Sequence, residues 1–189
     1  MSLLTTSSQT AGPYLRIGMA RFAIEELAPP GVSGERITLT GRFTDGDGKP
    51  IDDAAVEIWQ ANAQGKYAHP EDGQDKPIDA LFRGFGRSLT DAEGRYRFAT
   101  IRPGRVPGPG GALQAPHIAV TVLSRGLLKH LFTRVYFADD PANAEDPVLR
   151  LVPVERRTTL IAARTGGAKG AFEWNIRLQG VDETVFFDV

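Results

Sequence analysis

The chain has 189 residues, 41% hydrophobic and 24% charged, which is enough to bury the core of one ordinary domain. A formal net charge of −1 gives no electrostatic basis for capturing nucleic acid or an anionic membrane. The absence of cysteine excludes disulfides, zinc–thiolate sites, iron–sulfur clusters and thiol nucleophiles. No stretch approaches the ~20 apolar residues of a membrane helix, and the first residues do not read as a secretion signal, so we expect a cytoplasmic protein.

The N-terminal residues 1–35 show no regular pattern, and we expect them to form an irregular arm and interface segment ahead of a domain spanning residues 36–189. Within that domain, alternation of apolar and polar residues with period two predicts strands at 36–43, 56–60, 95–98, 118–122, 131–137 and 172–178. Turns rich in Asp and Gly at 45–50 and 91–94 supply tight reversals. Short strands with such turns are typical of an all-β fold, here a two-sheet β-sandwich with long irregular loops.

Two segments of the domain do not follow the alternating pattern. Residues 63–90 look irregular, and a loop of that length is more often functional than a mere connection. Residues 154–163 are compatible with either a helical turn or a short strand.

A chain without cysteine must bind any iron through imidazole, phenolate or carboxylate groups. The candidates are Tyr67, His69, His117 and His130. Spacing alone leaves open whether they bind a metal, pack within the fold or lie in solvent.

Two further features suit a ligand pocket. Strict alternation places Arg134 on one strand face with Phe132 and Tyr136, where its guanidinium could bind a carboxylate through two hydrogen bonds, or could remain solvated or paired within the fold. The segment Thr10-Ala11-Gly12-Pro13 breaks regular structure and lets the backbone approach another surface closely, although a frayed tail would look the same.

Taken together, the order and spacing of these motifs resemble the intradiol ring-cleaving dioxygenases. The matching segments are 37–42, 47–51, 56–62, 65–69, 86–87, 90–91, 94–98, 100–104 and 115–118. With the segments 8–14, 131–140 and 179–188, which resemble the iron-free chains of two-chain family members, the likeness covers nearly the whole sequence.

The resemblance implies four ligand positions for a non-haem ferric ion, two tyrosines and two histidines. Tyr67 occupies the first, within Gly65-Lys66-Tyr67-Ala68-His69, and His117 occupies the third. Val106 stands at the second, where the family has tyrosine, and Ala119 stands at the fourth, where it has histidine. Because an isopropyl and a methyl group donate no electron pair, we expect this chain not to hold iron tightly.

The resemblance further implies that the chain works with a homologous, iron-binding β chain in a higher-order hetero-oligomer. That partner would carry the Fe(III), and the substrates would be protocatechuate and O₂. Thr10, Gly12, Pro13 and Arg134 match the positions that wall the substrate pocket in such iron-free chains, with Arg134 facing the protocatechuate carboxylate.

Two other functions stay open at this point. A self-sufficient intradiol dioxygenase would use Tyr67, His69, His117 and Tyr136 as ligands. A non-catalytic β-sandwich binding module would account for the turn and strand pattern alone.

Overall fold

The computed structural model describes residues 5–166 and 169–188, so the first four residues of the predicted arm lie outside the described part. One α-helix, α1, spans Pro13–Met19. The strands are β1 Arg36–Thr44, β2 Ala55–Trp59, β3 Phe85–Leu89, β4 Arg95–Ile101, β5 His117–Leu123, β6 Leu131–Phe137, β7 Ile161–Arg164, β8 Ala171–Glu173 and β9 Ile176–Arg177. Short 3₁₀ helices lie at Ala20–Phe22, Pro109–Gly111, Pro141–Glu145, Leu149–Leu151 and Val154–Leu160.

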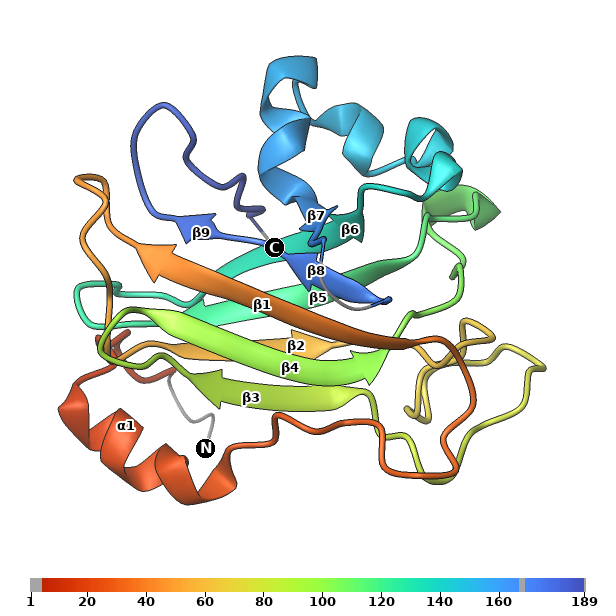
Figure 1. Cartoon of the computed structure of the whole chain (residues 1–189), viewed down its shortest axis with the longest axis horizontal. Helices are drawn as coiled ribbons and strands as arrows, with labels where there is room; N and C mark the ends of the chain where they lie inside the picture. Colours follow the sequence, from red (N-terminus) through yellow and green to blue (C-terminus); the bar gives the residue numbers. More distant parts are fainter. Residues whose placement is uncertain (1–4, 167–168, 189) are drawn as a thin grey trace.

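The strands form one hydrogen-bonded path in the order β3-β2-β5-β6-β7-β8-β1-β4, with β9 pairing with β1 (Figure 1). The predicted all-β class is confirmed. The two-sheet sandwich is not confirmed, because β7 pairs with β6 on one side and with β8 on the other and so joins the two halves. The path curls like a half-barrel, and its two ends, β3 and β4, approach each other.

An N-terminal segment, residues 24–27, connects the two ends of this path. Ile24 exchanges backbone hydrogen bonds with Arg87 of β3, at 2.8 and 2.9 Å. Leu27 donates to the Ala99 carbonyl of β4 at 2.8 Å, and Ala99 donates to the Glu25 carbonyl at 2.7 Å. We call residues 24–27 the seam segment, because their backbone satisfies edge groups of both end strands.

The core fills the inside of the curled sheet, and its members alternate along each strand. The side chains that lie there include Ile37, Leu39, Phe43, Val56, Ile58, Phe98, Ile118, Val120, Val122, Val135, Phe137 and Phe172. Ile37, Leu39 and Phe43 are all buried, which confirms the face predicted for the first strand. The turns at 45–50 and 91–94 also form as predicted, with Gly48 and Gly94 at positive φ.

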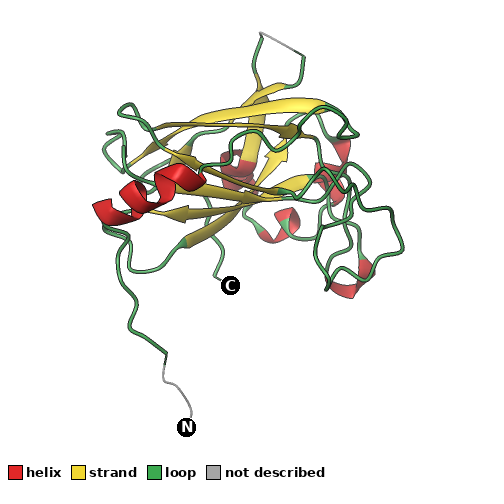
Figure 2. Cartoon of the chain, turned by 90° about the horizontal axis from the view of Figure 1, so that it is seen from below, coloured by secondary structure: helices red, strands yellow, loops and turns green. Residues whose placement is uncertain are grey.

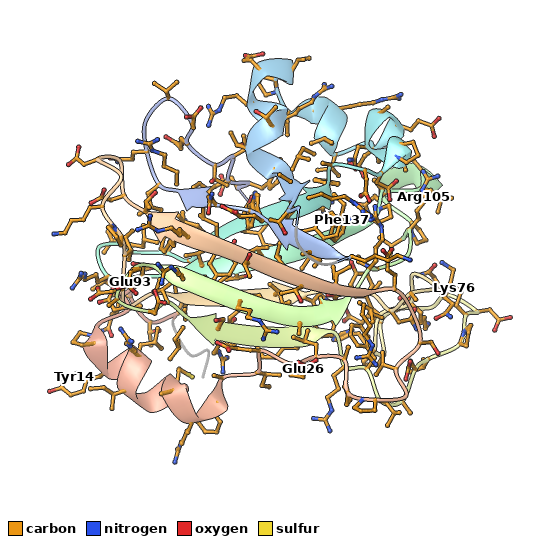
Figure 3. All side chains as sticks on the ribbon, in the orientation of Figure 1. Tyr14, Glu26, Lys76, Glu93, Arg105 and Phe137 are labelled. Atoms are coloured by element: carbon orange, nitrogen blue, oxygen red, sulfur yellow. The ribbon has the colours of Figure 1, made fainter. Side chains whose placement is uncertain are left out.

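The prediction of an irregular N-terminal arm is wrong for α1. Pro13 occupies the first turn, where its missing N–H costs nothing, and Gly12 before it is extended. None of the seven residues of α1, all of which the structure describes, is buried. A helix with no core-facing stripe gives no apolar periodicity to find. Tyr14 projects away from the sheet with 86% of its surface exposed (Figure 3).

The segment 63–90 is not irregular throughout, because it ends in β3. The buried positions of this strand are Gly86 and Ser88, which are too small to register as an apolar alternation. Gly86 is required to be small, since a Cβ there would lie 2.7 Å from the Leu27 side chain and 3.0 Å from the Ile24 carbonyl. Because the seam segment lies so close, β3 carries small residues at its buried positions, and its sequence lacks the apolar alternation that predicts a strand.

The strand predicted at 172–178 is interrupted between β8 and β9. Its burial still alternates, with Phe172, Trp174 and Ile176 all buried. The ladder breaks because side chains take over its hydrogen bonds: the Tyr96 hydroxyl donates to the Trp174 carbonyl at 2.5 Å, and the Asn175 side-chain oxygen accepts from the backbone of β1. At 154–163 both open interpretations are correct in part, since a 3₁₀ helix runs directly into β7.

Candidate functional site

A cavity of about 350 Å³ lies where the loop after β2 meets the loop after β4. Tyr67 and Val106, two of the four expected ligand positions, both line it. The Tyr67 ring stacks on Trp59 with centroids 5.8 Å apart and planes 13° from parallel. His69 meets the same Trp59 edge-on at 6.5 Å. The Tyr67 phenol is therefore held against the end of β2 by aromatic packing.

A buried ion pair fixes the loop that carries Tyr67. The Lys66 ammonium contacts the Asp72 carboxylate at 3.2 Å, and the other Asp72 oxygen accepts from the Tyr67 backbone N–H at 2.8 Å. Burial alone would raise the pKa of Asp72, but hydrogen bonds from Tyr67, Gln74 and Lys66 outweigh it and lower the pKa to about 2. The loop that presents Tyr67 is thus held by an ion pair and several hydrogen bonds centred on Asp72.

The other two expected ligand positions, His117 and Ala119, lie on β5. His117 begins the strand opposite Tyr136, with ring centroids 5.6 Å apart, and its Nδ1 is 2.9 Å from the Ala115 carbonyl oxygen. Only 4% of His117 is exposed. Burial lowers the pKa of His117 to about 4, and the charge of Arg134 lowers it in the same direction. His117 is therefore neutral at physiological pH.

Ala119 lies in the middle of a row that crosses three strands. Its partner on β2 is Trp59, and its partner on β6 is Arg134. Side chains in such a row share one face of the sheet, with directly opposed Cβ atoms about 4.5–5.5 Å apart. The small methyl group of Ala119 thus separates the Trp59 ring from the Arg134 side chain.

A buried carboxylate, Asp146, supports this end of the sheet. Its oxygens accept from the Tyr136 hydroxyl at 3.1 Å and from the backbone N–H groups of Ala115 and Leu149, both at 2.7 Å. Burial and the Asp146 charge together raise the pKa of Tyr136. This phenol is therefore a protonated hydrogen-bond donor to Asp146.

Arg134 reaches from β6 toward the loop that carries Val106. Its Nη1 donates to the Gln114 side-chain oxygen. Gln114 in turn donates from Nε2 to the Pro107 carbonyl at 3.0 Å and from its backbone N–H to the Val106 carbonyl at 2.9 Å. Burial raises the pKa of Tyr67, and the positive charge of Arg134 opposes that rise. Arg134 is thus linked through Gln114 to the loop that carries Val106, and its charge acts on Tyr67.

The residues at the four expected positions do not fit a ferric ion. Tyr67 and His117 retain donor atoms, whereas Val106 and Ala119 offer only hydrocarbon. Across the described residues, no cluster of three or more His, Asp or Glu side chains has a metal-binding arrangement.

Thr10, Gly12 and Pro13, which are expected to wall the pocket, lie near the opposite end of β5, where Thr10 meets the turn after that strand. The helix α1, which begins at Pro13, lies at one end of the molecule (Figures 1 and 2). The Thr10 hydroxyl accepts from Gly126 N–H at 2.8 Å and donates to the Ser124 carbonyl at 3.4 Å. Gly12 and Pro13 follow shortly after Thr10 in the chain, where α1 begins. Ser124 is five residues beyond Ala119, roughly 16 Å along a strand. Within this single chain, Thr10, Gly12 and Pro13 are therefore not brought together with Arg134.

The fold is that of a ring-cleaving dioxygenase. The family model described as Dioxygenase matches residues 26–180, and the chain belongs to the intradiol dioxygenase family, a family of oxidoreductases. It is 43% identical, over 100% of its own length and 99% of the relative's, to the protocatechuate 3,4-dioxygenase alpha chain of Burkholderia cepacia.

The chain is also similar to a beta chain of the same kind of enzyme. The protocatechuate 3,4-dioxygenase beta chain of Burkholderia cepacia is 43% identical over 80% of this chain and 67% of its own length. Among solved structures, the dioxygenase domain of a carbohydrate-binding fusion protein from Streptomyces sp. SirexAA-E superposes with a TM-score of 0.63 at 23% identity. The superposition covers 85% of this chain and 88% of the Streptomyces domain. At that identity the likeness concerns the fold alone.

Three residues that shape the site were missed by reasoning from sequence: Trp59, Gln114 and Asp146. Trp59 lies in a predicted strand, on the face expected to be partly exposed, and that position alone does not indicate a role in a site. Gln114 and Asp146 act through contacts between distant loops, for which the sequence carries no local signal. None of the helices in the described parts of the chain has the length and apolarity that crossing a membrane requires.

Proposed function

We propose that this chain is the iron-free α subunit of a protocatechuate 3,4-dioxygenase. With a homologous, iron-binding β chain it catalyses the intradiol cleavage of 3,4-dihydroxybenzoate by O₂ to 3-carboxy-cis,cis-muconate. The working enzyme is a higher-order αβ hetero-oligomer in the cytoplasm, its Fe(III) is bound by the β chain, and the isolated α chain is inactive.

The observation that carries this proposal is the half-erased ligand set. Tyr67 and His117 persist, while Val106 and Ala119 offer no donor, and a chain that must be catalytic alone would need all four. The end-to-end similarity to an alpha chain and the similarity to a beta chain support a two-chain enzyme.

In this enzyme Arg134, Thr10, Gly12 and Pro13 contribute to a substrate pocket at the α–β interface. The Arg134 guanidinium binds the substrate carboxylate through a fork of two hydrogen bonds. Within the described residues no carboxylate lies within 4 Å of this guanidinium, so it is available to one from a ligand. Because the two groups of residues lie far apart in one chain, the oligomer would bring copies or partners together to complete a pocket.

A self-sufficient dioxygenase using Tyr67, His69, His117 and Tyr136 is less compatible with the geometry. The Tyr136 hydroxyl is committed to Asp146, to which it donates a hydrogen bond at 3.1 Å. His69 is exposed, lies in a loop rather than a strand, and its Nδ1 accepts from the Glu71 backbone at 3.2 Å.

The test is expression of the chain alone and together with a β chain that carries two tyrosines and two histidines at the matching positions. We expect the chain alone to contain little iron and to leave protocatechuate intact. The two chains should copurify with iron, colour and activity. Stoichiometric iron in the isolated chain, or failure to associate with any such β chain, would refute the proposal.

A further inference from the structure

We infer that Arg134 occupies the relict metal site and is itself an obstacle to iron, beyond the loss of two ligands. The inference rests on the proposed function, since it takes Tyr67, Val106, His117 and Ala119 as the positions of an erased ligand set. Restoring tyrosine and histidine would then be insufficient to rebuild a ferric centre while Arg134 remains.

The first observation is the place of Arg134 relative to Ala119. The two residues are direct cross-strand partners of β5 and β6, on one face of the sheet. At that spacing a histidine at position 119 and the long arginine side chain would compete for the same space. The methyl group of Ala119 leaves this space to Arg134, which ties the loss of the imidazole to the presence of the guanidinium.

The second observation is the link from Arg134 to the other erased position. The guanidinium donates to Gln114, and Gln114 holds the backbone carbonyls of both Val106 and Pro107. Arg134 is therefore paired with the strand position that carries alanine in place of histidine, and it is linked through Gln114 to the loop that carries valine in place of tyrosine. A tyrosine at position 106 has room, because Val106 lines a cavity of about 350 Å³.

The third observation is electrostatic. Tyr67, in the loop after β2, and His117, at the start of β5, both lie in the field of Arg134. The permanent positive charge of Arg134 thus lies close to the two surviving donors, and neither the neutral His117 imidazole nor the protonated Tyr67 phenol compensates it. A ferric ion would enter against this charge, whereas an anion would be attracted.

The experiment compares full-length chains with the two erased donors restored. The double variant Val106→Tyr/Ala119→His keeps Arg134, and we expect it to stay poor in iron after incubation with Fe(III) citrate and desalting. The triple variant that adds Arg134→Gln should bind at least about tenfold more iron per chain, because the repulsion between cations is removed. It should also gain the visible absorption of a tyrosinate bound to Fe(III).

Matched variants separate charge from size. Adding Arg134→Lys instead keeps the positive charge, and this triple variant should remain as poor in iron as the double. Adding Arg134→Met removes the charge at similar length and should behave as the Gln variant does. Iron content is measured by mass spectrometry, and folding of each variant by its thermal unfolding curve.

Two results would overturn the inference. One is a double variant that binds as much iron as the neutral triple variants. The other is folded Gln and Met triple variants that bind no more than the double. If restoring Tyr at 106 unfolds the chain, Ala119→His with and without Arg134→Gln gives the same comparison. None of these outcomes depends on association with a β chain, so failure of the proposed function is seen separately.

Discussion

At the scale of single residues, the most consequential group is the buried His117. Its folded-state pKa of about 4 lies below the ordinary value of 6.5, so the unfolded chain binds this proton more readily. Protonation therefore favours the unfolded chain. This loss of folding stability is absent above pH 6.5 and grows as the pH falls toward 4. We expect the His117 contribution to the unfolding free energy to fall by about 2–3 kcal/mol between pH 7 and pH 4.5.

Urea unfolding of the chain at both pH values measures this loss, and His117→Asn provides the control. Asparagine can still donate to the Ala115 carbonyl but does not titrate. The variant should lose that much less stability on acidification than the parent. An equal loss in both chains would place the pH dependence in carboxylates instead.

The role proposed for Arg134 gives a second prediction at this scale. In the assembled α–β enzyme, Arg134→Ala should weaken binding of protocatechuate by about 1–3 kcal/mol, because a charge-assisted, two-bond contact with the carboxylate is lost. Unsubstituted catechol, which has no carboxylate, should be affected much less. Steady-state kinetics with both substrates measures the difference.

Arg134 also holds Gln114, so loss of packing must be separated from loss of the carboxylate contact. A packing defect would weaken both substrates alike, and equal losses would refute the assigned role. Arg134→Lys keeps the charge without the planar fork and should give an intermediate effect on protocatechuate.

At the scale of elements, the junction between β1, β8 and β9 depends on Gly41. A Cβ at this position would lie 1.8 Å from the Trp174 carbonyl oxygen and 2.6 Å from the Tyr96 hydroxyl. We expect Gly41→Ala to destabilise the fold by about 3 kcal/mol, because backbone must move and a buried hydrogen bond is strained. Gly18→Ala in α1 meets nothing within 4 Å and should leave thermal unfolding nearly unchanged.

The same junction illustrates what the sequence could predict. Alternation correctly located the strands around Ile37, Val56 and Val120, because each buries one clear apolar face against the core. It failed where tertiary contacts decide the structure. Tyr96 and Asn175 interrupt a strand by taking its hydrogen bonds, and Gly86 conceals a strand because the seam segment lies against it.

The site divides in the same way. The family resemblance pointed to Tyr67 and Val106, and the structure places both at one cavity. It could not show that Arg134 lies opposite Ala119, since register between two strands is set by pairing across the sheet. Nor could it show that Asp146 supports His117 through the Ala115 backbone, because these residues meet only in the folded chain.

At the scale of the whole molecule, the curled sheet leaves two end strands whose edges need partners. The seam segment supplies them, and Leu27 at its end is 5% exposed within the core. Residues 5–22 contribute differently. Through Thr10 and Arg16 they bond to the turn after β5 and to the Asp52 backbone, while the helix they form buries none of its described residues. The N-terminal 35 residues thus contain a structural part and a peripheral part.

This division predicts the outcome of two truncations. A chain lacking residues 1–22 should melt within about 4 °C of the full chain, since the described part of that segment, residues 5–22, contains no buried residue. A chain lacking residues 1–28 also loses the seam segment and Leu27, and its melting temperature should fall by at least about 10 °C. When it is paired with a β chain, the chain lacking residues 1–22 should still assemble, but the enzyme should be less active because Thr10, Gly12 and Pro13 are missing. If the two truncations melt alike, the seam segment does not close the sheet, and the boundary predicted at residue 35 would be the better division.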